Sequence, residues 1–87
     1  MYTAEIILKN KTGLHARPAS QFVATASKFH SDIFVVKNDK EYNAKSIMGV
    51  LSMGAGMGTN LTIKAEGPDE KEAVEALERL VNTSFGE

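Results

Sequence analysis

The first loop of the chain ends and its first helix begins within the stretch Thr12-Gly13-Leu14-His15-Ala16-Arg17-Pro18-Ala19. Pro18 suits the first helical turn, because its missing N–H would have no partner there. The residue before a proline avoids helical dihedral angles. The sequence therefore predicts that the helix begins between His15 and Pro18.

Outward from this stretch, apolar residues recur with the periods of strands and helices. The expected elements are a strand at 2–9, a helix reaching 29, strands at 33–36 and 41–43, a short helix at 47–52, a strand at 61–65 and a helix over 69–81. Asp69 and Glu72 are expected to open the last helix as a capping-box-like pair. The order β-α-β-β-α-β-α predicts an α+β domain with helices on one face of a sheet, and it leaves the strand order open.

The composition narrows the classes of function. The length of 87 residues predicts one domain over 1–87. Because the chain has no cysteine and only two histidines, without the spacing of metal ligands, we expect no disulfides and no metal site. The 10 basic and 11 acidic side chains leave a net charge near zero. The near-zero net charge argues against a nucleic-acid binder, and no apolar run is long enough to insert into a membrane. The chain shows no signal-peptide pattern, so the expected location is the cytoplasm. We also expect a monomer that needs no cofactor.

The first helix start offers a site for a phosphoryl group. The first amides of a helix have no intrahelical partner and attract anions. An imidazole at this position is discouraged from becoming a cation, and the neutral form is the nucleophile. A phosphoryl group on His15 would meet the amides of Ala16 and Arg17, and the Arg17 guanidinium would hold its oxygens. The alternative is that His15 is only a helix cap.

Two motifs together resemble one family. The second is Asn43-Ala44-Lys45-Ser46-Ile47-Met48-Gly49-Val50-Leu51-Ser52-Met53-Gly54. With the stretch around His15, it resembles HPr, the histidine-containing phosphocarrier of the bacterial phosphoenolpyruvate-dependent sugar phosphotransferase system. The resemblance implies an open-faced β-sandwich, in which three helices cover one face of a four-stranded antiparallel sheet. It also implies a carrier rather than an enzyme, which accepts a phosphoryl group from enzyme I on Nδ1 of His15 and passes it to sugar-specific IIA components.

Ser46 precedes a short apolar helix and is expected to be its N-cap. A phosphate is favourably placed at a helix start. The sequence around Ser46 resembles that of relatives of the Gram-positive type. In those relatives this serine is phosphorylated by HPr kinase/phosphorylase. The modification slows transfer to the histidine and creates a surface for a catabolite-control transcription factor. The resemblance therefore implies carbon catabolite regulation through Ser46.

The short helix is expected to leave apolar side chains exposed, because two turns cannot bury every side. Exposed apolar patches mark docking sites, and methionine adapts to several partners. The resemblance places this patch beside His15 as the surface for enzyme I and IIA components. Its expected members are Ile47, Met48 and Leu51, extended by Ala16 and Ser20.

Other functions remain open at this point. The nearest is an HPr paralogue that only regulates or binds partners, acting through Ser46 and the apolar patch, although the presence of His15 counts against it. Three less favoured alternatives are a carrier in a nitrogen-related phosphorelay, a non-catalytic α+β interaction module and a small hydrolase. The glycines over 54–58 lack a following Lys-Ser/Thr, so we expect a flexible turn there rather than a P-loop. His30 is expected to be a surface residue.

Overall fold

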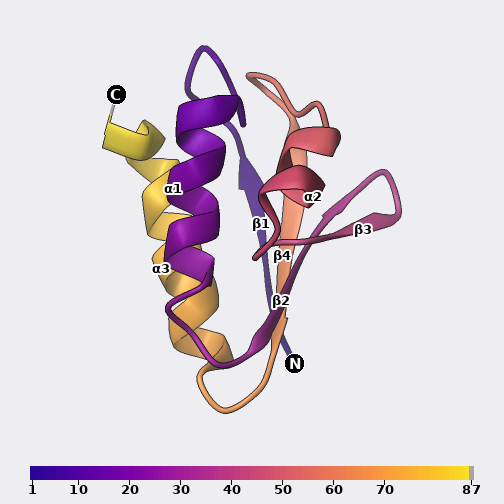
Figure 1. Ribbon diagram of the computed structural model, residues 1–87, viewed down its shortest axis with the longest axis vertical. Coiled ribbons are helices and arrows are strands. Elements are labelled where there is room, and N and C mark those ends of the chain that lie inside the picture. Colours follow the sequence, from indigo (N-terminus) through magenta and orange to yellow (C-terminus); the bar gives the residue numbers. More distant parts are fainter. Residues whose placement is uncertain (87) are drawn as a thin grey trace.

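In the computed structural model, which describes residues 1–86, four strands form one antiparallel sheet and three α-helices cover one of its faces (Figure 1). The elements are β1 (Tyr2–Ile7), α1 (Ala16–Ala26), β2 (Asp32–Lys37), β3 (Lys40–Asn43), α2 (Ile47–Ser52), β4 (Asn60–Glu66), α3 (Glu70–Asn82) and the 3₁₀ turn η1 (Ser84–Gly86). The predicted open-faced α+β fold and its element order are confirmed. No helix within residues 1–86 is long and apolar enough to cross a membrane.

The strand order, which the sequence pattern left open, is β1-β4-β2-β3. The central pairings place Ile63 of β4 between Ala4 of β1 and Val35 of β2. Alternate residues of β4 are buried, as the period of two requires for a strand with one covered face. The consecutive strands β1 and β2 are therefore separated by β4, which enters the sheet between them.

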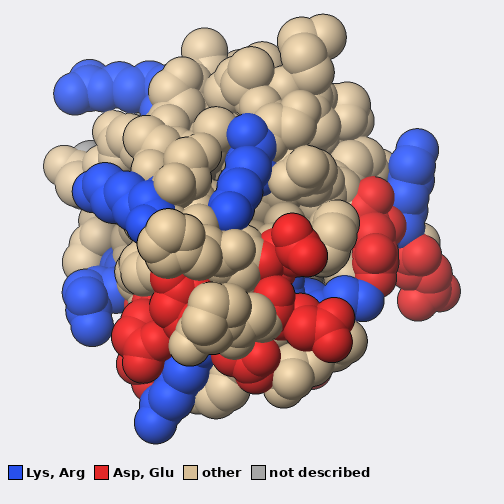
Figure 2. Space-filling model, turned by 60° about the horizontal axis from the view of Figure 1, so that its bottom comes forward, with Lys and Arg blue, Asp and Glu red and all other residues tan. Residues whose placement is uncertain are grey.

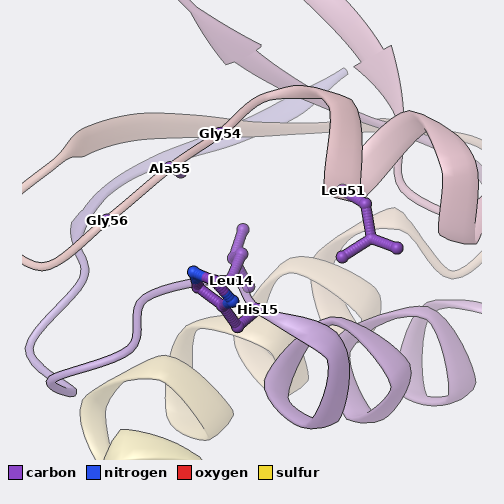
Figure 3. A pocket seen from close by; sticks show the side chains of 6 residues that line it. All are labelled: Leu14, His15, Leu51, Gly54, Ala55 and Gly56. Atoms are coloured by element: carbon purple, nitrogen blue, oxygen red, sulfur yellow. The ribbon is translucent and has the colours of Figure 1, made fainter.

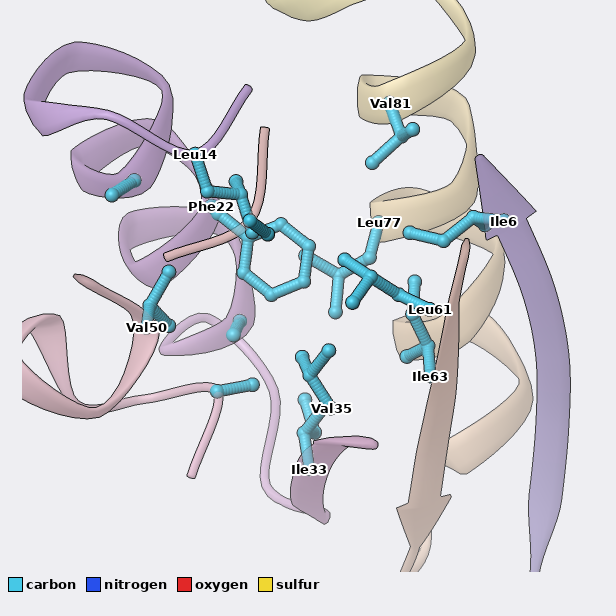
Figure 4. Close-up of a cluster of buried hydrophobic side chains, with 14 of the residues drawn as sticks. Ile6, Leu14, Phe22, Ile33, Val35, Val50, Leu61, Ile63, Leu77 and Val81 are labelled. Carbon is cyan, nitrogen blue, oxygen red and sulfur yellow. The ribbon is translucent and has the colours of Figure 1, made fainter. Parts of the chain in front are cut away.

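The core lies between the sheet and the helices. Phe22 of α1 has no exposed surface, and Leu77 of α3 and Ile63 of β4 are equally buried (Figure 4). Burial of side chains of this size stabilises the fold by about 1.5–3 kcal/mol each. Both long helices are thereby fixed on the sheet by apolar packing, and the start of α1 is held in place.

The predicted capping box at α3 is wrong. Asp69 is the N-cap, but its side chain makes no cap hydrogen bond within the helix. Its carboxylate instead accepts hydrogen bonds from Ser31 and from the His30 amide across the loop. Glu70, rather than Glu72, reaches back, because its Oε1 accepts a hydrogen bond of 3.1 Å from the Gly67 amide. The Asp69 oxygens that would have capped α3 are therefore bonded to residues 30 and 31, which are distant in the sequence.

Two boundaries differ from the expectation by more than one residue, and one further element was not predicted. Strand β1 ends at Ile7 rather than at residue 9, and α1 ends at Ala26, so Phe29 packs against the core from the following loop. The turn η1 was not expected. It places Phe85 at 4% exposure by means of a positive φ of 57°.

Candidate functional site

His15 is the N-cap residue of α1. Its backbone is extended, with φ −79° and ψ −172°, and its carbonyl accepts a hydrogen bond of 2.8 Å from the Ala19 amide. The imidazole is exposed and makes no cap hydrogen bond. The predicted helix start is confirmed, and the side chain at that start does not serve as the capping group.

The first turn of α1 presents donors without a protein anion. The amides of Ala16 and Arg17 have no intrahelical acceptor at this position, and Pro18 carries no N–H. No acidic residue lies in this turn. The Arg17 side chain is exposed and forms no hydrogen bond or ion pair with the part of the chain that the structure describes. Two backbone donors thus follow His15 in the chain, and the guanidinium of Arg17 is not held by another group among residues 1–86.

The imidazole of His15 lines a shallow pocket of about 220 Å³ between α1, α2 and the segment 54–56 (Figure 3). Leu51 of α2 contributes an apolar wall, and Ala55 contributes part of the wall formed by the segment 54–56. The Ala55 carbonyl also accepts a hydrogen bond of 2.9 Å from the Leu14 amide. The glycine run is therefore more than the expected turn, because it packs against the residues just before His15.

Gly13 is required for this packing. Its φ is +60°, and a Cβ atom there would lie 2.3 Å from the Ala55 carbonyl oxygen. Both the backbone conformation and the close approach exclude a larger residue without strain. The segments 10–14 and 54–56 can approach each other only because residue 13 has no side chain.

Asn10 fixes the turn that precedes His15. It is 3% exposed, and its Nδ2 donates hydrogen bonds to the Gly13 carbonyl at 2.8 Å and to the Thr12 hydroxyl at 3.3 Å. The Gly13 amide donates in return to the Asn10 carbonyl at 3.2 Å. The sequence pattern predicted no more than a loop for this segment. An asparagine three residues before a glycine was the available signal.

Ser46 is the N-cap of α2, as expected. Its Oγ accepts a hydrogen bond of 3.1 Å from the Gly49 amide, and its backbone is extended. The residue is half-buried. Its hydroxyl lies at the first turn of α2, where the helix dipole favours negative charge.

The expected apolar patch is exposed. Met48 is 74% exposed, whereas Ile47 and Leu51 are 38% and 39% exposed, and Leu51 lines the same pocket as His15. On the neighbouring helix, Ala16 and Ser20 are also exposed. We call these five residues the docking patch. The structure places them on α1 and α2, which pack against each other.

Acidic side chains are absent from the segments that build this site. Residues 6–31 and 42–65 contain no Asp or Glu, although Lys9, Lys11 and Arg17 lie near His15 in the sequence. Figure 2 brings the lower end of Figure 1 forward and shows Asp and Glu side chains gathered there. A site built from segments that carry basic but no acidic side chains favours an anionic ligand or partner. Within residues 1–86, no cluster of His, Cys, Asp or Glu is arranged to hold a metal ion.

Comparisons with known proteins agree on one family. Residues 2–83 match the family model described as the PTS HPr component phosphorylation site. The phosphocarrier protein HPr of Neisseria meningitidis is 46% identical over 87 residues, covering 100% of this chain and 98% of that protein. The HPr-like protein Crh of Halalkalibacterium halodurans is 51% identical over 77 residues, covering 88% and 92%. The crystal structure of HPr-C-His from Thermoanaerobacter tengcongensis superposes with a TM-score of 0.98 at 55% identity, covering 100% and 98%.

Proposed function

The chain belongs to the HPr family of phosphocarriers of the phosphotransferase system, and from this premise we propose that it carries a phosphoryl group on His15. Phosphorylated enzyme I is the donor, and sugar-specific IIA components are the acceptors during sugar uptake. Residues 1–87 act as one phosphocarrier domain, a monomer in the cytoplasm. The proposal needs no cofactor or metal, because both half-reactions move a phosphoryl group between protein side chains.

The main support for this proposal is that the imidazole at the start of α1 makes no cap hydrogen bond. The amides of Ala16 and Arg17 that follow His15 have no intrahelical acceptor, while the Arg17 guanidinium has no partner among residues 1–86. A phosphoryl group on the imidazole would supply the anion that this helix start lacks. Charge-assisted hydrogen bonds from these groups would then hold its oxygens.

Transfer proceeds by in-line displacement. The Nδ1 lone pair of His15 attacks the phosphorus carried by enzyme I, a new N–P bond forms, and the bond to the donor atom breaks with its electrons returning to that atom. The second transfer repeats this step with His15 as the donor. Because phosphoryl transfer depends on positioning and charge stabilisation, the carrier contributes geometry and donors. It is phosphorylated stoichiometrically in the first transfer and regenerated in the second. It is therefore a carrier rather than an enzyme.

The docking patch gives both partners access to His15. Met48 is the most exposed of its members, and Leu51 borders the pocket of the imidazole. Apolar side chains on a short helix suit transient complexes with several partners. Enzyme I and the IIA components therefore share this surface in turn.

Ser46 provides regulation in the same proposal. HPr kinase/phosphorylase phosphorylates its hydroxyl, which slows transfer at His15 and prepares the surface for a catabolite-control transcription factor. Support comes from the position of Ser46 at the start of α2, where the dipole accommodates a phosphate. Incubation with the purified kinase and ATP is expected to add one phosphate that Ser46→Ala abolishes, and an unmodified wild-type chain would overturn this part.

A regulatory paralogue is the second candidate, because the HPr-like protein Crh is 51% identical to this chain. Such a protein would act through Ser46 and the docking patch without carrying a phosphoryl group on His15. A reconstituted relay separates the two. With phosphoenolpyruvate, enzyme I and a IIA component, the phosphocarrier passes phosphate to the IIA component, whereas the paralogue leaves it unphosphorylated.

A further inference from the structure

The peptide unit that joins Gly13 to Leu14 is held at both of its polar ends. Its carbonyl accepts the hydrogen bond of 2.8 Å from Nδ2 of Asn10, and its N–H donates the hydrogen bond of 2.9 Å to the Ala55 carbonyl. Leu14 is also 3% exposed, so its side chain is anchored in the core. The backbone immediately before His15 therefore has little rotational freedom.

Of the groups around this peptide unit, Asn10 is the one that acts through its side chain. The Ala55 bond is made by the backbone and survives any substitution there that keeps the fold. The Asn10 bond depends on one carboxamide, which is 3% exposed. Removing the carboxamide would release the Gly13 carbonyl and leave this peptide unit held only by the bond from its N–H to the Ala55 carbonyl, so the peptide could open and rotate more often.

The orientation of the Asn10 carboxamide has a cost. Among the described residues, Oδ1 of Asn10 is buried and has no hydrogen-bond partner. A buried acceptor without a partner destabilises a fold, and such atoms are rare in native proteins. The side chain thus directs its donor at the Gly13 carbonyl and leaves its acceptor unsatisfied.

We propose that Asn10 is a positioning residue for phosphoryl transfer, whose side-chain hydrogen bond to the Gly13 carbonyl fixes the direction in which the backbone delivers His15 to the start of α1. The inference rests on the proposed function above and deepens it. In-line transfer tolerates little error, since a misplacement of about 1 Å can slow a reaction about a hundredfold. Rotation of the Gly13–Leu14 peptide would move the imidazole relative to the Ala16 and Arg17 amides.

The test measures kcat and KM of enzyme I with the carrier as its substrate, for wild type, Asn10→Ala and Ser31→Ala. Ser31→Ala is the matched control, because it removes a buried hydrogen-bonding side chain near the opposite end of α1. The docking patch is unchanged in Asn10→Ala, so KM is expected to stay within about twofold while kcat falls about tenfold. Ser31→Ala is expected to lower the melting temperature and leave kcat unchanged.

Amide hydrogen exchange gives a second readout that does not depend on transfer. In Asn10→Ala the Leu14 amide is expected to exchange faster than in Ser31→Ala, after correction for global stability. If Asn10→Ala does not fold, Asn10→Ser takes its place, because its hydroxyl is one bond shorter and does not reach the Gly13 carbonyl.

The outcomes are distinct. A lowered kcat with an unchanged KM and faster Leu14 exchange supports the positioning role. A wild-type kcat in the Asn10 variants, or a loss that Ser31→Ala reproduces, overturns it while the carrier function stands. Failure of the wild-type chain to accept phosphate overturns both proposals, and it is recognised by the wild-type reaction alone.

Discussion

Asp69 and Ser31 hydrogen-bond to each other in both directions and so connect the start of α3 to the loop before β2. Oδ1 of Asp69 accepts hydrogen bonds from the Ser31 amide at 2.9 Å and from its hydroxyl at 2.5 Å, and the Asp69 amide donates to Ser31 Oγ at 3.2 Å. The His30 amide donates to Oδ2 at 2.9 Å. The Ser31 hydroxyl, followed by the His30 amide, lowers the pKa of Asp69 from 3.8 to about 2.

The pair predicts a loss of stability in acid. Because the pKa of Asp69 is lower in the folded than in the unfolded chain, its carboxylate stabilises the fold fully above pH 3.8. That contribution is lost as the pH falls toward and through about 2. Urea unfolding of wild type and Asp69→Asn between pH 2 and 7 measures it. The difference between the two is expected to be constant near neutrality and to shrink below pH 3.8.

Asp32→Asn serves as the control for this titration, since Asp32 is exposed. Its difference from wild type is expected to change little over the same range. A difference between wild type and Asp69→Asn that is unaltered at pH 2 would show that the carboxylate does not stabilise the fold through its charge.

Gly13→Ala is expected to destabilise the fold by about 3 kcal/mol, because a positive φ is combined with a clash against the Ala55 carbonyl. Gly54→Ala is the matched control. Gly54 has a φ of +62°, but a Cβ atom there would meet nothing within 4 Å, so only the conformational cost of about 1 kcal/mol remains. Denaturant unfolding compares the two, and equal losses would contradict the close packing of residues 13 and 55.

Met48→Glu is expected to leave the fold intact and to weaken binding to enzyme I by about tenfold or more. Met48 is 74% exposed, so the substitution disturbs little packing but places a charge in the docking patch. Titration calorimetry measures the affinity. Ile7→Glu, at a 51% exposed position on β1, is the control and is expected to bind normally. Unchanged affinity in Met48→Glu would remove this residue from the interface.

Arg17→Ala is expected to slow transfer from enzyme I by about ten- to a hundredfold, because a hydrogen bond to a charged group contributes about 1.5–3 kcal/mol. The fold should be unaffected, since Arg17 is exposed and forms no hydrogen bond or ion pair among residues 1–86. Rapid-quench kinetics measure the rate. Lys71→Ala removes an exposed cation from α3 as the control. Equal rates in both variants would exclude a role for the guanidinium.

Local signals were enough to predict both helix starts near the site. Pro18 and the unpaired amides locate the beginning of α1, and Ser46 before an apolar run locates α2 at its observed bounds. Each prediction depends on residues within one turn of the boundary. The exposure of Met48 also followed from a local argument, because a two-turn helix cannot bury all of its sides.

Contacts between distant segments were not predictable in this way. Nothing near Asp69 in the sequence indicates that its carboxylate bonds to Ser31 instead of capping α3. The sequence near Ala55 likewise does not indicate that its carbonyl accepts a hydrogen bond from the Leu14 amide, because the two loops are distant in the sequence. Strand order and the pocket wall at 54–56 both depend on such long-range packing.

The most direct test of the carrier function is the intact mass of the protein after incubation with phosphoenolpyruvate and enzyme I. We expect wild type to gain one acid-labile phosphoryl group and His15→Ala to gain none. An enzyme I that phosphorylates another carrier but leaves this wild-type chain unmodified would contradict the proposed function, and so would equal phosphorylation of His15→Ala.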